Sequence, residues 1–502
     1  MSDDRSSGTS LTQSVKSGVA WTTFTFAITK GLALLSILVL ARLLAPSEFG
    51  VVAGIVVLLS LIELTADLGM AQAVIYEQGP GHDERVDVAF TVNMLLTTAL
   101  TVVVFLAAPL IAKFFNAEGH VSLYRLASLD VLFTGLGSVH DGLLLRDLRF
   151  RTRNVTQVVS ALVRAGLGVL LAVLGFGAAS LVWGMIAGTL ALTVALWVVT
   201  RYTPRLRLSR TIAESIIPYG IGASLLSLLS QVTVQLDSAV VGRVLGTRAL
   251  GFYSIAFRLP TLLLENIANQ VSLVAFPALS RKRVMDAEGV GAATWKLVRY
   301  QSLYSLPLAA GMAVQAKPIV VTVFSAKWSP AAGVFAAVSV MSGLSASAFA
   351  LGDAFKALAR QRVMVALTLI QLPVLIATII LMAPYGITAV AWARAGGVAL
   401  WVALMTWAAA WVLEIPVRGT LGAMWPGAAT ALGVAAGAGA IRLWSGLPAV
   451  PEIVLAILAG TAGGLAVLRL LAPAVLTELR HEAVGMIRRR SRPVVKDPAP
   501  ST

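Results

Sequence analysis

The sequence predicts an all-α polytopic membrane protein of about 14 transmembrane helices, arranged as two six-helix lobes related by a pseudo-two-fold axis plus two extra helices. Of its 502 residues, 58% are hydrophobic and only 13% are charged, whereas soluble domains carry about a quarter charged residues. Apolar stretches of about 20 residues recur along the chain, each long enough to cross a hydrocarbon core roughly 30 Å thick. A short motif also occurs twice, in breaks between such stretches.

The spans are assigned from these apolar runs and the polar residues that interrupt them. The first is too long for a signal-peptide core and has no small-residue cleavage site after it, so we expect it to remain as a true span. The predicted spans are 18–41, 49–76, 86–112, 120–142, 154–174, 178–200, 214–241, 250–277, 295–316, 332–355, 362–382, 386–412, 421–441 and 452–471.

The net charge of +15 is interpreted as a topology signal and not as a sign of nucleic-acid binding. With a cytoplasmic N-terminus, the inner loops contain most of the clustered basic residues: Arg146, Arg149, Arg151, Arg153, Arg201, Arg205, Arg207, Arg210, Arg281, Lys282, Arg283, Lys356, Arg360 and Arg362. The outer loops hold little beyond Arg42, Lys113, Arg243, Arg248, Lys317, Lys327 and Arg442. The positive-inside rule therefore predicts that both termini are cytoplasmic.

The repeated motif lies in equivalent outer loops. It reads ARLLAPSEFGVVA at 41–53 and GRVLGTRALGFYS at 242–254, so that Arg42 matches Arg243 and Gly50 matches Gly251. Parallel repeats of this kind enclose the substrate site of many transporters, although a chance match is the alternative. The predicted domains are an N-terminal lobe (1–213), a C-terminal lobe (214–420), two appended helices (421–475) and a basic cytoplasmic tail (476–502).

Ionisable side chains occur at membrane depth, where each costs about 2.5 to 3.5 kcal/mol if it faces lipid. They are Lys30, Glu63, Asp67, Asp130, Arg164, Arg258, Glu265 and Arg394. We therefore expect them to face one another or a wet cavity. Two arrangements are left open: substrate or ion binding, and structural ion pairs such as Lys30 with Glu63 or Asp67, and Arg258 with Glu265.

Helical spacing places further polar residues with these charges. One stripe on span 214–241 consists of Ser224, Ser227, Gln231, Gln235 and Ser238, at intervals of three or four residues. The next span continues with Arg258, Glu265 and Asn269 around a kink predicted at Pro260. The repeat aligns Lys30 with Gln231. The first two spans of each lobe are therefore predicted to line a cleft between the two lobes.

Several function classes are disfavoured by what the sequence lacks. It has no cysteine and four scattered histidines, which argues against thiolate chemistry and a metal centre. It has no GxxxxGK[ST] loop for ATP, no long loop that could form a catalytic domain, and no visible selectivity ring of a channel. We therefore predict a transporter, not an enzyme, with no cofactor.

The stretch ARLLAPSEFGVVAGIVVLLSLIELTADLGMAQAVI at 41–75 resembles the Wzx-type oligosaccharide flippases of the multidrug/oligosaccharidyl-lipid/polysaccharide (MATE-like) superfamily, in particular the colanic acid and teichuronic acid exporter branch. The resemblance is strongest over residues 15–80, in the Arg-Leu-Leu-x-Pro-x-x-Phe-Gly hinge and the Asp-Leu-Gly at 67–69. Elsewhere it extends only to length, span count and loop charge.

This resemblance implies alternating-access transfer of an undecaprenyl-pyrophosphate-linked saccharide repeat unit to the outer leaflet of a bacterial plasma membrane. It also implies a cationic cavity, for which the substrate-binding candidates are Lys30, Arg164, Arg258, Arg394, Gln231, Gln235 and Asn269. The candidate ion-coupling carboxylates are Glu63, Asp67 and Glu265, with the coupling ion, a proton or sodium, left open. The expected partners are this lipid-linked saccharide, membrane lipids, a polysaccharide polymerase and glycosyltransferases, and no nucleic acid.

Three rival functions remain open at this point. A cation-coupled multidrug exporter of the same fold would be expected to have a cavity dominated by carboxylates and usually twelve spans. A lipid II flippase is closer, although that role belongs to a different branch of the superfamily. A membrane-embedded glycosyltransferase or ligase, or a scaffold, is the non-transport alternative, and a ligase would be expected to have a large outer loop with basic and histidine residues.

Overall fold

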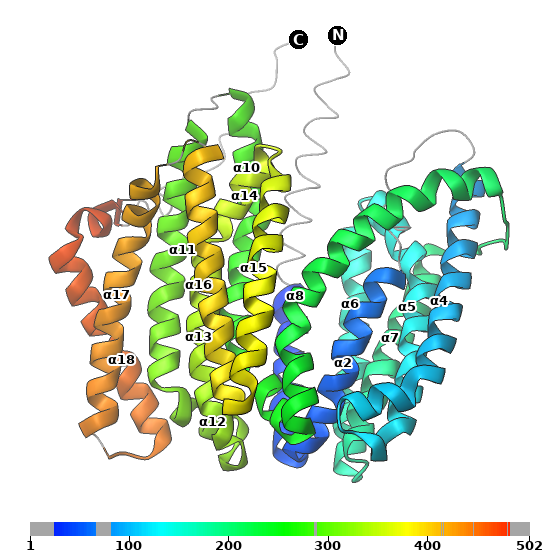
Figure 1. Ribbon diagram of the computed structural model, residues 1–502, viewed down its shortest axis with the longest axis horizontal. Helices are drawn as coiled ribbons and strands as arrows, with labels where there is room; N and C mark the ends of the chain where they lie inside the picture. The colour runs from blue at the N-terminus through cyan, green and yellow to red at the C-terminus, as the bar shows by residue number, and fades with distance from the viewer. Residues whose placement is uncertain are drawn as a thin grey trace, which may run out of the picture. The chain divides into compact units, whose positions relative to one another are not determined.

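The structure is a computed structural model that describes residues 25–66, 82–285, 289–412, 414, 416–444, 446–478 and 480–481. Within these ranges, the side chains of 63–66, 82–83, 210–230, 284–285 and 412 are not described. Every regular element in the described ranges is a helix (Figure 1). The prediction of an all-α protein is therefore confirmed.

The first described helix spans Thr25–Leu43. The elements that follow are α2 (Pro46–Ala66), α4 (His82–Phe114), η1 (Glu118–His120), α5 (Val121–Arg146), α6 (Phe150–Val173), α7 (Ala178–Thr200), α8 (Arg210–Ala256), α9 (Arg258–Pro260), η2 (Thr261–Glu265), α10 (Asn266–Met285), α11 (Gly289–Val314), α12 (Ala316–Phe324), η3 (Ala326–Ala331), α13 (Ala332–Ser347), α14 (Phe349–Ala357), α15 (Gln361–Met382), η4 (Ala383–Tyr385), α16 (Ile387–Val412), α17 (Val417–Trp444) and α18 (Ala449–Leu471).

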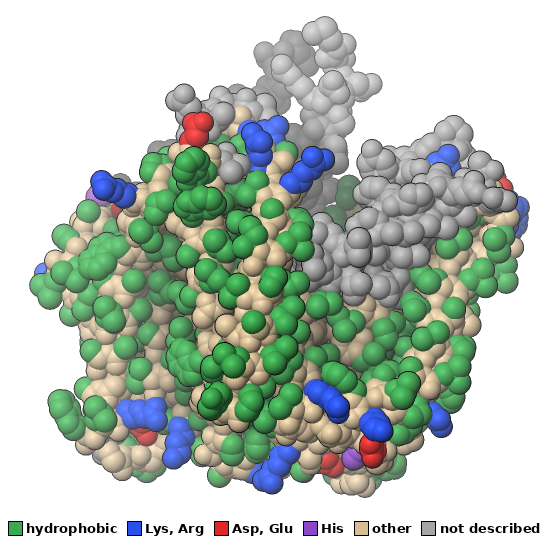
Figure 2. Space-filling model, viewed as in Figure 1, with side chains coloured by type: hydrophobic (Ala, Val, Ile, Leu, Met, Phe, Trp, Pro, Cys, Tyr) green, Lys and Arg blue, Asp and Glu red, His purple; other side chains and the backbone are tan. Residues whose placement is uncertain are grey.

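Ten helices in the described ranges are long and apolar enough to cross a membrane. The prediction of a polytopic membrane protein is confirmed, whereas the number of about 14 spans remains a prediction. The two counts differ partly because Gln231–Arg283, which covers parts of two predicted spans, counts as one stretch, and because the apolar part of α2 is short, Pro46–Ile62. On the face shown in Figure 2, hydrophobic side chains cover the middle of the helices and Lys and Arg gather toward helix ends.

The chain divides into two compact units that are interleaved along the sequence. The first comprises Met1–Leu262, Val320–Phe335 and Leu372–Arg394, and the second comprises Leu263–Ile319, Ala336–Gln371 and Ala395–Thr502. These units are defined by contacts within each of them, whereas the predicted lobe boundaries rest on the sequence repeat. The predicted boundaries at residues 213, 420 and 475 therefore stay predictions.

The regular helical hydrogen bonding is interrupted after α8, where a kink was predicted at Pro260. Helix α8 ends at Ala256, the three-residue α9 ends at Pro260, and a π-helical turn, η2, covers Thr261–Glu265 before α10 resumes. Proline lacks the backbone N–H of the regular ladder and its ring crowds the preceding turn, so the helix is rearranged around it. π-Helical turns inside longer helices are frequent at functional sites, and Glu265 ends this one.

The repeated motif forms a reciprocal contact inside the first unit. A Cβ atom on Gly50 would overlap the carbonyl oxygen of Thr247, and a Cβ atom on Gly251 would overlap the carbonyl oxygen of Pro46. In the repeat, Pro46 is the counterpart of Thr247 and Gly50 is the counterpart of Gly251. Each copy therefore places its glycine against the same position of the other copy, as an isologous two-fold contact requires.

In the second unit α17 and α18 pack through small residues. Gly433 and Gly463 approach each other's backbone, and a Cβ atom on Gly437 would overlap the carbonyl oxygen of Ala459. Helix α17 also lies against α11, where Ser302 Oγ lies 3.4 Å from the Ala423 carbonyl oxygen to which it donates a hydrogen bond. Close backbone approach of this kind is how helices associate in a membrane, where lipid removes the hydrophobic drive for packing.

Candidate functional site

Two of the four predicted cations are arginines that have no partner among the described residues. Arg164 on α6 and Arg258 on α9 both have exposed side chains and belong to the first unit. Neither side chain has a hydrogen bond or an ion pair in the part of the chain that the structure describes. Their charges do interact with each other, and this interaction is repulsive. Two guanidinium groups that repel each other and have no counter-charge among the described side chains would be stabilised by a bound anion.

Helices α6 and α7 approach each other closely at Arg164, because the facing residues of α7 are glycines. A Cβ atom on Gly188 would lie 2.7 Å from the Cβ of Arg164, and one on Gly184 would lie 2.9 Å from the Arg164 carbonyl oxygen. The Ser160 hydroxyl, one turn earlier, donates a 2.8 Å hydrogen bond to the Gly188 carbonyl oxygen. These contacts fix the backbone that carries Arg164, and the Cβ atom added at Gly188 would also lie 3.4 Å from Arg164 Nε, so the side chain runs beside α7.

Lys30 also lies exposed on the first described helix, Thr25–Leu43. Its Nζ atom is 5.8 Å from the centroid of the Phe26 ring, which is a weak cation–π contact within the same helix. Its suggested carboxylate partners are not available for comparison, because the side chain of Glu63 and all of Asp67 lie outside the described residues. The suggested structural pairing of Lys30 therefore stays a prediction.

Arg394, the fourth predicted cation, has a buried counter-charge. Its Nε atom is 3.1 Å from Asp237 Oδ2, and its Nη1 donates a 3.1 Å hydrogen bond to the Thr233 carbonyl oxygen. The Tyr253 hydroxyl donates to the same carboxylate oxygen at 2.7 Å. Asp237 is 1% exposed and the Arg394 side chain only 12%. Removing one partner of such a buried pair leaves the other charge uncompensated, so this pair holds α8 in place.

Asp237 is not among the site residues predicted from the sequence. It lies within the predicted span next to Ser238, but it is off the stripe that Gln231, Gln235 and Ser238 form. Helical periodicity selects residues on one face, and Asp237 points to another face, toward Arg394 and Tyr253. The useful signal was the charge itself, because a carboxylate in an apolar span needs a partner.

The polar stripe on α8 reaches α2 at one described position. Gln235 Nε2 donates a 2.8 Å hydrogen bond to Ser60 Oγ. Helices α2 and α8, which carry the two copies of the repeated motif, are therefore joined by side chains as well as by the glycine contact. Gln231 is half-buried, and the side chains of Ser224 and Ser227 lie outside the described residues. Whether these residues contact a substrate stays a prediction.

The remaining predicted residues belong to the second unit. Glu265 accepts a 2.6 Å hydrogen bond at Oε1 from the Ser342 hydroxyl and is half-buried. No ion pair of Glu265 occurs among the described side chains. Asn269, one turn later on α10, is exposed. Asp353, which was not predicted from the sequence, is 2% exposed and accepts a 2.6 Å hydrogen bond from the hydroxyl of Ser272 on α10.

Comparison with solved structures identifies the fold. The lipid II flippase MurJ, in an inward closed conformation, superposes with a TM-score of 0.75 at 14% identity, covering 90% of this chain and 99% of that chain. An inward-facing multidrug resistance MATE family transporter of the MOP superfamily superposes with a TM-score of 0.64 at 16% identity, covering 79% of this chain and 98% of that chain. At these identities the similarity shows the fold alone.

Several curated proteins are similar to this chain in sequence. The succinoglycan biosynthesis transport protein ExoT of Rhizobium meliloti (strain 1021) is 27% identical over 66% of this chain and 67% of its own length. The lipopolysaccharide biosynthesis protein WzxC of Escherichia coli (strain K12) is 24% identical over 70% and 71%. The teichuronic acid biosynthesis protein TuaB of Bacillus subtilis (strain 168) is 22% identical over 66% and 69%.

A family profile covers more than half of the chain and includes both copies of the repeated motif. It matches residues 39–333 and is described as "Polysaccharide biosynthesis protein". The matched segment contains Arg164 and Arg258 and ends before Arg394. The chain therefore belongs to the polysaccharide biosynthesis protein family.

Proposed function

We propose that this chain is a flippase that transfers an undecaprenyl-pyrophosphate-linked oligosaccharide repeat unit from the cytoplasmic to the outer leaflet for the synthesis of cell-surface polysaccharide. The family, the names of the relatives and a fold shared with lipid and drug transporters support this function. The observation that carries it is a pair of exposed arginines, Arg164 and Arg258, which repel each other and have no partner in the described part of the chain. We place the protein in the bacterial plasma membrane, with both termini cytoplasmic.

The two arginines suit a pyrophosphate because of their charge and shape. The guanidinium group is planar and presents its donors as a fork, so it can bind two oxygen atoms of one phosphate at once. An anion that lies between Arg164 and Arg258 also relieves the repulsion between them. Hydrogen bonds to charged groups contribute about 1.5 to 3 kcal/mol each, so two such forks distinguish a pyrophosphate from a neutral lipid head.

The other predicted residues take supporting roles in this proposal. Lys30 and the amides Gln231 and Gln235 would add donors to the head group or the saccharide, and Asn269 stays a separate predicted contact with the substrate. Arg394 would act chiefly through Asp237, by keeping α8 in register while its remaining donors contact the substrate. Glu63, Asp67 and Glu265 are the candidate coupling carboxylates for protons or sodium ions, and Glu265, which ends the π turn, is the one whose contacts the structure describes.

The membrane potential favours the proposed direction of transfer. The interior of the cell is negative by roughly 100 mV, so moving a head group with about two negative charges outward lowers its electrostatic free energy by about 4 to 5 kcal/mol. Export of the anion is therefore electrically downhill. Ion coupling would supply further energy for export. Glycosyltransferases would provide the substrate, and a polysaccharide polymerase would consume the product.

The decisive experiment replaces the two arginines in cells that depend on this protein for surface polysaccharide. We expect Arg164→Ala and Arg258→Ala each to lower polymer output about tenfold or more, and the double variant to abolish it, because one charged contact is worth about 1.5 to 3 kcal/mol. Arg360→Ala, which removes an exposed arginine outside this site, is the matched control and should retain output. Membrane abundance is measured in parallel by immunoblot.

Normal polymer output from the double variant, at normal abundance, would remove the arginine pair from the site. The rival substrate is lipid II, which the similarity to the fold of MurJ favours, and it needs a second experiment. Because lipid II also carries a pyrophosphate, the arginine variants do not separate the two substrates. Rescue of cells depleted of their own lipid II flippase does, and rescue by the wild-type chain would overturn the assignment to an oligosaccharide repeat unit.

A further inference from the structure

The segment that joins α7 to α8 in the first unit has an alternating sequence. It covers residues 201–209, reads RYTPRLRLS and contains no helix, and we call it the strap. Polar residues alternate along it with apolar ones. The polar set is Arg201, Thr203, Arg205, Arg207 and Ser209, and the apolar set is Tyr202, Pro204, Leu206 and Leu208. A period of two residues is the pattern of an extended chain with one polar and one apolar face.

The backbone of the strap is tethered to α4. The Arg205 N–H donates a 3.0 Å hydrogen bond to Asp87 Oδ1, and the Arg207 N–H donates a 3.0 Å hydrogen bond to Thr91 Oγ1. The two acceptors are one helical turn apart, about 6 Å along α4, and two residues of extended chain cover about 6.6 Å. The strap therefore runs alongside α4 as an extended chain here, and Ser209 continues it with φ −117° and ψ 114°.

The apolar set is covered by protein at its beginning and uncovered at its end. Tyr202 is half-buried and its hydroxyl donates a hydrogen bond to Asp87 Oδ1. Pro204 is half-buried as well. Leu206 and Leu208, by contrast, are 75% and 72% exposed. Removing leucine side chains from water is favourable, so this half of the apolar face is available for another apolar environment.

The apolar residues of α4 and α7 indicate the level of the strap relative to a bilayer. Among the described side chains of α4, the exposed large hydrophobic ones begin at Leu95 and end at Phe114. This belt is about 29 Å long, which matches the hydrocarbon core of a bilayer. Thr91 lies one turn before Leu95, about 6 Å outside the belt. On α7 the last such residue is Val198, just before the strap. The strap therefore lies at the level of the lipid head groups.

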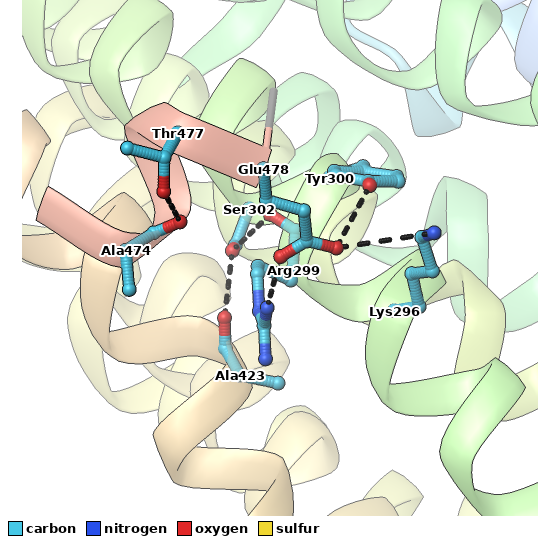
Figure 3. A network of polar contacts seen from close by, with 8 residues as sticks. All are labelled: Lys296, Arg299, Tyr300, Ser302, Ala423, Ala474, Thr477 and Glu478. Carbon is cyan, nitrogen blue, oxygen red and sulfur yellow. Dashed lines mark hydrogen bonds and ion pairs between the residues drawn. The ribbon is translucent and has the colours of Figure 1, made fainter. Parts of the chain in front are cut away.

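The segment 473–478, which follows the span α18 in the second unit, is held in a different way (Figure 3). There a side chain of the segment makes the contact: Arg299 Nη1 donates to Glu478 Oε2 at 2.8 Å, and the Tyr300 hydroxyl donates to Glu478 Oε1 at 3.2 Å. In the strap it is the backbone that is tethered at Arg205 and Arg207. Backbone tethers fix the path of a chain and leave its side chains to contact other molecules.

We propose that the strap is an interfacial membrane anchor, in which Leu206 and Leu208 insert at the boundary between lipid head groups and acyl chains while Arg205 and Arg207 stay in the head-group layer. Irregular backbone is costly beside lipid unless its polar groups have partners, and the two tethers to α4 supply partners at this position. The binding partner is the bilayer surface itself, and insertion of leucine requires no anionic lipid. The anchor fixes α4 and the start of α8 at one depth, independently of the transport substrate.

The test measures the depth of single sites in the full-length protein, reconstituted in vesicles of phosphatidylcholine. The chain contains no cysteine, so Leu206→Cys and Leu208→Cys each create a unique site for a fluorescent NBD label. Arg205→Cys and Arg207→Cys are the matched controls, one residue away on the opposite face. A nitroxide quencher on the lipid chains should quench the labels at 206 and 208 about threefold more than those at 205 and 207, and iodide in the water should show the reverse order. Phosphatidylcholine has no net charge, so attraction of arginine to anionic lipid does not produce this pattern.

Size-exclusion elution before reconstitution checks the folding of each variant. Equal quenching at all four sites would overturn the anchor, and so would a label at 206 that is shielded from both quenchers, because protein would then cover it in place of lipid. Thr91→Val keeps the shape of the side chain and removes the acceptor of the Arg207 N–H. Combined with the Leu206→Cys label, it should reduce lipid quenching about twofold, since the tether sets which way the neighbouring side chains face. Unchanged quenching in this folded variant would overturn the role of the tether.

Discussion

The two copies of the repeated motif solve one structural problem with different residues. In the first copy the helix breaks before Pro46, which begins α2, and the Glu48 carboxylate accepts a 2.6 Å hydrogen bond from the Ala45 backbone N–H. In the second copy α8 bends at Gly246, whose φ of 82° and ψ of 178° are not helical. Proline suits the first turn of a helix because it lacks an N–H, whereas glycine permits the positive φ of the second copy.

The free carbonyl groups at the two hinges are also satisfied differently. At the first hinge Lys327 Nζ donates 2.8 Å hydrogen bonds to the carbonyl oxygens of Arg42 and Leu44. At the second, Asn116 Nδ2 donates to the carbonyl oxygens of Gly242 and Arg243, at 3.3 and 2.9 Å. What the copies share is the reciprocal glycine contact. Backbone against backbone leaves room for glycine alone, whereas a carbonyl group can be satisfied by any donor that reaches it.

The largest expected effect comes from adding a methyl group at that shared contact. Gly50→Ala and Gly251→Ala should each destabilise the protein by about 3 kcal/mol or more, because the new Cβ meets a backbone carbonyl group that cannot rotate away. Thermal unfolding in detergent and abundance in the membrane would show the loss. Gly31→Ala is the control, since nothing lies within 4 Å of its added Cβ, and it should be neutral or slightly stabilising. Wild-type stability of both hinge variants would contradict the reciprocal contact.

A second prediction concerns Trp328, which contacts both hinges. Its ring packs edge-on against Phe49 at 5.2 Å and Phe252 at 5.9 Å, and its Nε1 donates a 2.8 Å hydrogen bond to the Ala41 carbonyl oxygen. Trp328 is fully buried, so Trp328→Ala should cost about 3 to 5 kcal/mol.

Trp328→Phe separates packing from hydrogen bonding. It keeps an aromatic ring but leaves the Ala41 carbonyl group without this donor, which should cost about 1 to 3 kcal/mol. Both losses are measured by thermal unfolding against Trp444→Ala, because Trp444 is 85% exposed and should tolerate the change. Equal stability of the alanine variants at 328 and 444 would show that Trp328 does not join the hinges.

How far sequence reasoning reached is visible at these same residues. The apolar runs located the helices and the Arg-to-Gly spacing located both hinges, because each is a local pattern. The contact of Gly50 with Thr247 joins distant parts of the chain and could not be derived from either copy. Lys327 was assigned only to an outer loop, since loop charge indicates sidedness but does not identify a hydrogen-bond acceptor. Two residues predicted for ion coupling cannot be compared, because the side chain of Glu63 and all of Asp67 lie outside the described residues.

The candidate site was predictable to a similar depth. Membrane cost selected Arg164, Arg258 and Arg394 as a group, because an ionised side chain in lipid needs compensation. It could not separate them, since compensation by a buried carboxylate and by a bound anion look alike in a sequence. The structure separates them, with Asp237 beside Arg394 and no carboxylate partner for the other two among the described residues.

The smallest effect is expected at the two caps, and it tests whether the hinges act as one element. Lys327→Met and Asn116→Ala should each cost about 0.5 to 1.5 kcal/mol, because both donors are exposed and water can replace them in part. If each cap served only its own hinge, the two losses would add within about 0.5 kcal/mol in the double variant, as distant sites do. The reciprocal glycine contact joins the hinges, so releasing one of them weakens the packing of the other. Thermal unfolding of the four proteins in this cycle should therefore show a double-variant loss that departs from the sum, whereas strict additivity would indicate two hinges that merely touch.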